Sequence, residues 1–160
     1  MMKEKAVSEI NFLLVDDEEP FVVTIAERLR KRGFTVDCAY SGMDALNILG
    51  NKDTIDIVIL DIKLPDGDGI NILRKIKTKY PLIEVIMITG YAAINSAVES
   101  LKLGAFDYLT KPFDLDDLII KAKKAENRKR EREAQIHDAR MKPYISEQER
   151  NELISKILEK

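Results

Sequence analysis

The chain has 160 residues, of which 45% are hydrophobic, and its formal net charge is −2. This length and composition are typical of a soluble globular protein with one well-buried domain and a short appendage. No apolar run approaches the roughly 20 residues of a membrane-spanning helix, and residues 1–9 lack the apolar core of a signal peptide. The single cysteine, Cys38, excludes an internal disulfide and is expected to be a buried free thiol. The composition therefore favours a cytoplasmic protein without membrane contact.

Charge is distributed unevenly along the chain. Residues 1–120 carry 14 Lys and Arg against 20 Asp and Glu, a balance of −6, whereas residues 121–142 carry 9 against 4, a balance of +5. The acidic residues partly collect where strands are expected to end. The basic cluster from Arg128 to Arg132 is interpreted as a solvated helix face, so direct nucleic-acid binding is not expected.

Apolar patterns predict five strands, each followed by a helix. The predicted strands cover residues 10–15, 34–40, 57–60, 83–89 and 106–110. The predicted helices lie between residues 20 and 33, 41 and 50, 70 and 81, 93 and 103, and 115 and about 141. Such alternation implies right-handed β-α-β units and a parallel sheet with helices on both faces. The predicted fold is α/β, a flavodoxin-like doubly wound (βα)5 sheet with strand order 2-1-3-4-5.

A charged helical extension follows these units, and we divide the chain into a domain at residues 9–126 and an extension at 127–160. Beyond Glu126 the heptad register is too polar to predict a coiled coil. Ser146 to Glu149 resembles a capping box for a last amphipathic helix, whose apolar face must be buried on this chain or on a partner. The extension is therefore a candidate dimerisation or output-linker segment. The apolar face comprises Leu153, Ile154, Ile157 and Leu158.

Functional side chains stand at the ends of the predicted strands. Asp16 and Asp17 follow the first strand, Asp61 the third, Thr89 the fourth and Lys111 the fifth. Because the carboxyl ends of parallel strands share one edge of a sheet, these side chains are expected to meet there. Carboxylates that converge without His or Cys indicate Mg²⁺, although paired acids also occur at solvated helix N-termini.

This combination indicates phosphoryl transfer to an aspartate. A carboxylate nucleophile at Asp61, a divalent cation, the Lys111 ammonium and the Thr89 hydroxyl would together bind and stabilise a transferring phosphoryl group. A structural salt bridge to one of the acids is the alternative role for Lys111.

At these residues the chain resembles the receiver domain of two-component response regulators, over about residues 9–126. The run from Gly90 to Phe113 is also similar to receivers of sigma-54-dependent NtrC-type transcription activators. The motifs that carry the resemblance are Leu-Val-Asp16-Asp17-Glu18, Ile-Leu-Asp61-Ile-Lys-Leu-Pro65-Asp-Gly67, Ile-Thr89-Gly90-Tyr91 and Tyr108-Leu-Thr-Lys111-Pro112-Phe113.

By this resemblance Asp61 is the phosphoacceptor. Asp17 and Asp61 are expected to bind Mg²⁺ directly, together with the backbone carbonyl of Lys63, while Asp16 acts mainly through a metal-bound water. The protein would catalyse only its own phosphorylation and dephosphorylation, with no other enzymatic activity.

The resemblance also implies a switch and a set of partners. Thr89 and Tyr108 are expected to form the switch pair, and Lys111-Pro112 a cis peptide bond. The phosphodonor would be a sensor histidine kinase or a histidine phosphotransfer protein, and the receiver would act on a downstream output domain or protein. The chain could be free-standing or the N-terminal part of a transcriptional regulator.

Two other classes of function compete with this interpretation. Phosphatases of the haloacid-dehalogenase type also form an aspartyl-phosphate, but they need a second Asp two residues after the nucleophile, where this chain has Lys63. A DNA-binding regulator acting through its basic tail would show binding that weakens steeply with salt.

Overall fold

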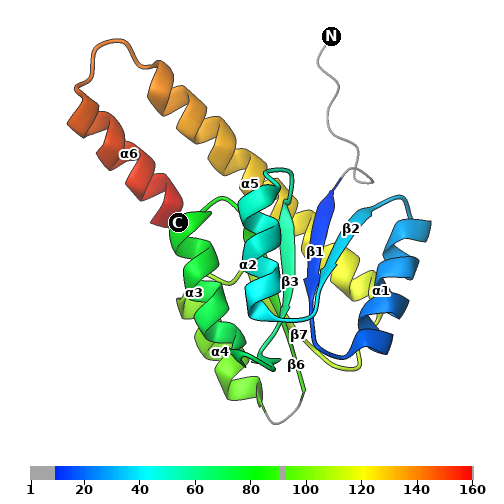
Figure 1. Ribbon diagram of the computed structural model, residues 1–160. Helices are drawn as coiled ribbons and strands as arrows, with labels where there is room; N and C mark the ends of the chain where they lie inside the picture. The colour runs from blue at the N-terminus through cyan, green and yellow to red at the C-terminus, as the bar shows by residue number, and fades with distance from the viewer. Residues whose placement is uncertain (1–9, 91–92, 160) are drawn as a thin grey trace.

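A computed structural model describes residues 10–90 and 93–159 of the chain. Five parallel strands form one sheet in the order β2-β1-β3-β6-β7, which confirms the predicted order 2-1-3-4-5 (Figure 1). The sheet strands are β1 (Asn11–Val15), β2 (Thr35–Ala39), β3 (Ile57–Asp61), β6 (Glu84–Thr89) and β7 (Asp107–Thr110). A small antiparallel ribbon of β4 (Lys63–Leu64) and β5 (Gly67–Asp68), which the sequence analysis did not predict, follows β3.

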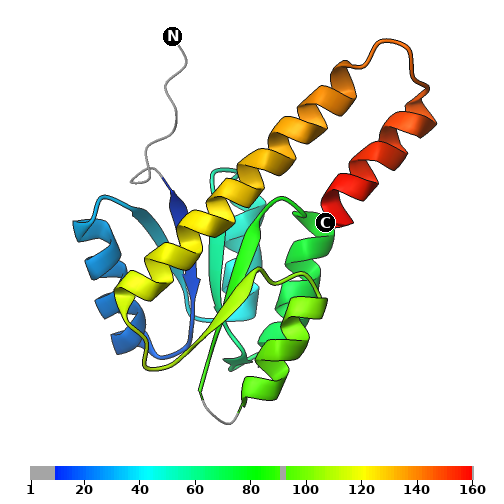
Figure 2. The same cartoon turned by 180° about the vertical axis from the view of Figure 1, so that it is seen from behind.

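Helices cover both faces of the sheet, as expected for a doubly wound fold (Figures 1 and 2). Helices α1 and α5 lie on one face, and α2, α3 and α4 lie on the other. Their bounds are α1 (Glu19–Lys31), α2 (Gly42–Asn51), α3 (Gly69–Lys79), α4 (Ile94–Lys102), α5 (Leu115–Met141) and α6 (Glu147–Glu159).

Two apolar clusters, one on each face, form the core. The cluster under α1 and α5 includes Phe12, Ile59 and Leu118, and the cluster under α2, α3 and α4 includes Val58, Leu60 and Leu73. Alternate residues of the central strand β3 serve the two clusters, and all five of its residues are buried. A strand buried on both faces is rigid, and it positions the residue at its carboxyl end.

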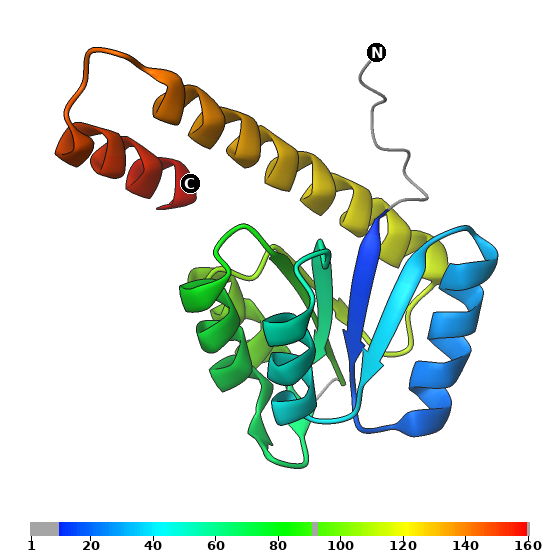
Figure 3. The same ribbon diagram turned by 45° about the horizontal axis from the view of Figure 1, so that its top comes forward.

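Helix α5 continues without a break past residue 126, the predicted end of the domain, to Met141. Helix α6 then runs back along it, so that the two form a hairpin that projects beyond the sheet (Figure 3). The predicted capping box is confirmed in part, because the hydroxyl of Ser146 accepts a hydrogen bond from the backbone N–H of Glu149 at 3.1 Å. The apolar face of α6 is half-buried on this chain. Residue 9, the predicted start of the domain, lies outside the described residues.

The interpretation of the basic cluster at Arg128 to Arg132 as a solvated helix face was wrong for Arg128, Lys129 and Arg132, whereas Arg130 is exposed. The ammonium of Lys129 lies 2.8 Å from the carboxylate of Asp56, just before β3. Arg132 lies 3.2 Å and Arg128 lies 3.5 Å from the carboxylate of Glu84, at the start of β6. Carboxylates buried at the amino edge of the sheet draw these cations inward, so they do not form a free basic surface for nucleic acid.

Within residues 10–90 and 93–159, the helices are either too short or too polar for any of them to cross a membrane.

Candidate functional site

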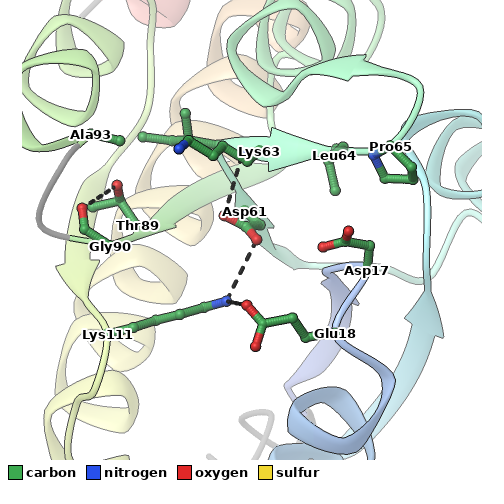
Figure 4. A pocket seen from close by; sticks show the side chains of 11 residues that line it. Asp17, Glu18, Asp61, Lys63, Leu64, Pro65, Thr89, Gly90, Ala93 and Lys111 are labelled. Atoms are coloured by element: carbon green, nitrogen blue, oxygen red, sulfur yellow. Dashed lines mark hydrogen bonds and ion pairs between the residues drawn. The ribbon is translucent and has the colours of Figure 1, made fainter.

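A pocket of about 400 Å³ opens at the carboxyl edge of the sheet (Figure 4). Asp17 and Glu18 enter it from the loop after β1, Asp61 from the end of β3, Thr89 from the end of β6 and Lys111 from just after β7. The structure therefore brings the predicted strand-end residues to one place, as the parallel topology requires. Its described lining residues include no His or Cys.

Three carboxylates crowd together in this pocket. Asp16, Glu18 and Asp61 each place one oxygen so that all three lie within 4.8 Å of one another. Asp16 and Asp61 are buried, whereas Glu18 is exposed. Asp17 faces the same pocket but is not part of this group (Figure 4). Asp16 and Asp61 were expected here from the sequence, whereas Glu18 was named only as part of a motif and was given no role in the site.

The Lys111 ammonium is the cation that neutralises this group. Its Nζ lies 2.5 Å from Asp16, 3.3 Å from Glu18 and 3.5 Å from Asp61. The ring of Phe21 lies beneath it, with Nζ 4.4 Å from the ring centroid. Lys111 thus makes the salt bridge that the sequence analysis gave as one of its two roles.

Burial and charge shift the pKa values of Asp61 and Lys111. Burial, followed by the neighbouring charge of Asp16, raises the pKa of Asp61 to about 6, although Lys111 and the Lys63 N–H lower it. Burial lowers the pKa of Lys111, but the hydrogen bond to Asp16 and the acidic charges around it outweigh burial, so the pKa lies above its usual value. At neutral pH Asp61 is therefore mainly ionised and Lys111 charged, which suits a nucleophile beside an anion-binding cation.

The two predicted switch residues lie on neighbouring strands. The Thr89 hydroxyl donates to the backbone carbonyl of Gly90 at 3.0 Å (Figure 4). Tyr108 on β7 is half-buried and packs against the core under α2, α3 and α4. Tyr91, which belongs to the same sequence motif as Thr89, lies outside the described residues.

The loop after β3 fixes the position of Asp61. The backbone N–H of Lys63 donates to the Asp61 carboxylate at 3.3 Å.

Asp66 accepts hydrogen bonds from the backbone N–H groups of Gly42 and Met43 at the start of α2, both at 2.9 Å, and these bonds lower its pKa. This role of Asp66 was not predicted from the sequence, because Gly42 and Met43 lie 24 and 23 residues away from it along the chain.

Glycine is required where α3 begins. A Cβ on Gly69 would lie 2.1 Å from the backbone oxygen of Asp61. The Gly69 N–H donates to the backbone oxygen of Ile62 at 2.7 Å, so α3 starts directly against the end of β3. The Lys111-Pro112 peptide bond is cis, as predicted.

The fold and this pocket are those of a phosphoacceptor signalling domain. The chain belongs to the response regulator receiver domain family, whose model matches residues 12–123. This confirms the resemblance seen in the sequence.

Individual relatives agree with this assignment. The NtrX-like response regulator of Rickettsia felis is 44% identical over 121 residues, which are 74% of this chain and 25% of that protein. The crystal structure of a response regulator receiver domain protein from Clostridium thermocellum has a TM-score of 0.73 and 38% identity, and the match covers 76% of this chain and 97% of that one. NtrX from Brucella abortus has a TM-score of 0.76 and 30% identity over 92% of this chain and 34% of that one. The match thus spans about a quarter of the length of the curated relative.

Proposed function

We propose that Asp61 accepts a phosphoryl group and so converts the receiver to its signalling state. An oxygen of the Asp61 carboxylate would bond to phosphorus while the bond from phosphorus to the donor breaks. The electron pair of that bond leaves with the donor, on the imidazole nitrogen of a phosphohistidine or the carboxylate oxygen of acetyl phosphate. The observation that carries the proposal is the position of Asp61, in a pocket with the Lys111 ammonium at 3.5 Å.

The residues present fit Mg²⁺. Crowded carboxylates repel one another, and hard oxygen donors without His or Cys are the ligands that Mg²⁺ prefers. We propose that Asp17, Asp61 and the backbone carbonyl of Lys63 hold the ion directly and that Asp16 acts through a bound water. Bound there, Mg²⁺ would neutralise charge on the phosphoryl oxygens.

The new phosphoryl group would act on the switch pair. Its oxygens would accept a hydrogen bond from the Thr89 hydroxyl, which must then leave the carbonyl of Gly90. They would also contact the Lys111 ammonium. Movement of Thr89 would make room for the ring of Tyr108 to turn inward. The surface of α4, β7 and α5 would change as a result, which is a local charge event biasing a two-state element.

The partners follow from the family. We propose that a histidine kinase or a histidine phosphotransfer protein supplies the phosphoryl group in the cytoplasm, and that an output domain or protein reads the changed surface. The domain would have no activity beyond its own phosphorylation and dephosphorylation. A homodimer through residues 127–160 belongs to the same proposal.

The test is phosphorylation with acetyl phosphate and Mg²⁺, followed by intact-mass measurement. Wild-type protein is expected to gain one alkali-labile phosphoryl group and Asp61→Asn none. Asp53→Asn is the control, since this exposed Asp lies near the opposite edge of the sheet. Full labelling of Asp61→Asn would refute the assignment.

The dimer proposal has its own test. The sedimentation mass of the full chain is compared with that of a chain ending at residue 126. A dimer through the extension predicts that the longer chain has twice its monomer mass, and equal monomeric behaviour of both chains would rule it out.

A further inference from the structure

Glu18 makes a contact in the pocket that its place in the fold does not require. It is the N-cap residue of α1, a position where Ser, Thr, Asp or Asn usually accepts a hydrogen bond from the first backbone N–H groups of the helix. The Glu18 side chain makes no such bond. Its carboxylate instead turns into the pocket and lies 3.3 Å from the Lys111 ammonium (Figure 4).

The backbone of Glu18 holds this arrangement in place. Its N–H donates to the carboxylate of Asp16 at 2.9 Å, and its carbonyl accepts from the N–H of Val22 at 3.0 Å. The first turn of α1 therefore presents two side chains to Lys111, the carboxylate of Glu18 and the ring of Phe21.

We propose that Glu18 is a positioning residue that competes with the phosphoryl group for the Lys111 ammonium. The inference rests on the function proposed above. Among the described residues, Lys111 also pairs with Asp16 and Asp61, and these are the residues that would bind the metal ion and the phosphoryl group in that function. Glu18 is the carboxylate left to hold Lys111 near α1, which favours the unphosphorylated state.

The size of the effect follows from the exposure of the pair. The Glu18 side chain is 65% exposed and that of Lys111 is 17% exposed. Exposed ion pairs are weak, and the competition is expected to change the affinity for a phosphoryl mimic by about two- to fivefold. Neutralising Glu18 also removes a negative charge that repels the incoming anion, so both effects act in the same direction.

The test measures the affinity of the full chain for beryllofluoride by isothermal titration calorimetry, with Mg²⁺ at saturation. The Mg²⁺ affinity of each variant is measured separately, so that saturation is established. Glu18→Gln is expected to bind beryllofluoride two- to fivefold more tightly than wild type. Glu19→Gln is the matched control, because Glu19 is the next residue, carries the same charge and does not line the pocket.

Glu18→Asp separates contact from charge. The shorter side chain keeps the charge but withdraws from Lys111, and Asp is a favourable N-cap residue that would turn toward the helix. If contact is responsible, Glu18→Asp binds beryllofluoride more tightly than wild type, as Glu18→Gln does. Wild-type affinity in Glu18→Asp or Glu18→Gln, or an equal gain in Glu19→Gln, would overturn the role of Glu18. Failure of wild-type protein to bind beryllofluoride would instead refute the proposed function itself.

Discussion

Arg132 of α5 and Glu84 of β6 form a buried ion pair between segments that are 48 residues apart. The guanidinium nitrogen lies 3.2 Å from the carboxylate, and the side chains are 5% and 0% exposed. Glu84 stands at the amino end of the strand whose carboxyl end carries Thr89. One strand therefore links the anchoring point of the helical extension to the candidate phosphorylation site.

Neutralising Glu84 is expected to destabilise the protein strongly. Glu84→Gln would leave Arg132, Arg128 and the nearby Lys77 ammonium without their shared carboxylate. Removing one partner of a buried ion pair lowers the free energy of unfolding by about 3 kcal/mol. Because Arg128 is partly exposed and can be solvated, we expect a loss of about 2–3 kcal/mol. Urea denaturation measures this loss, and hydrogen exchange should show faster exchange over residues 127–141.

Glu133→Gln is the control for this change. Glu133 pairs with Lys129, but its side chain is 45% exposed. Such a pair contributes about 0.5 kcal/mol or less. Equal stabilities of Glu84→Gln and Glu133→Gln would contradict an anchoring role of Glu84.

Lys77 gives the stability a distinctive pH dependence. Burial, together with the charges of Arg132 and Arg128, lowers its pKa to about 8 in spite of Glu84. The folded state therefore releases this proton at lower pH than the unfolded state does, so stability rises as the pH increases through the window from about 8 to 10.5. Between pH 8 and 9.5 the expected gain is about 1–2 kcal/mol.

The measurement is urea denaturation at several pH values in wild type and Lys77→Met. The gain should be absent in Lys77→Met, which has no titrating group at this position. Lys79 lies two residues after Lys77, on the exposed side of α3, and Lys79→Met should keep the gain. A Lys77→Met profile that rises as steeply as wild type would show that another group is responsible.

Gly69 is expected to tolerate no side chain. In Gly69→Ala the new Cβ would meet the backbone of Asp61 and Ile62, neither of which can move without shifting β3. We expect a loss of about 2–3 kcal/mol in urea denaturation, the upper part of the range for overpacking. Gly90→Ala is the comparison, because a Cβ there meets nothing within 4 Å and its stability should be close to that of wild type.

Truncation tests how far the folded unit extends. A chain that ends at residue 126 loses Arg128 and Arg132, so that, of the cations that the described residues place beside Glu84, Lys77 at 3.9 Å remains. We expect a loss of about 3 kcal/mol. A chain that ends at residue 143 loses only α6, which contains no buried residue, and should lose about 1 kcal/mol. Equal stability of the two truncated chains would place the boundary at residue 126 after all.

The residues that meet at the carboxyl edge of the sheet could be predicted from the sequence, because their meeting depends only on the topology of the strands. Once the pattern of apolar runs gives parallel strands, Asp16, Asp61, Thr89 and Lys111 must share one edge, whatever the details of packing. The roles of Asp66 and Gly69 could not be predicted in the same way. Both depend on which backbone atoms come within reach when α2 and α3 are packed against β3.

The sequence by itself determined the family, the order of the strands and the position of Asp61 at a strand end, because local periodicity and residues at strand ends carry that information. Only the tertiary structure decided where the long charged side chains go. Glu18 turns toward Lys111 instead of capping its helix, and Arg132 turns inward toward Glu84 instead of into solvent. A flexible charged side chain pairs with the carboxylate or ammonium that the fold brings near, and no spacing along the chain specifies that partner.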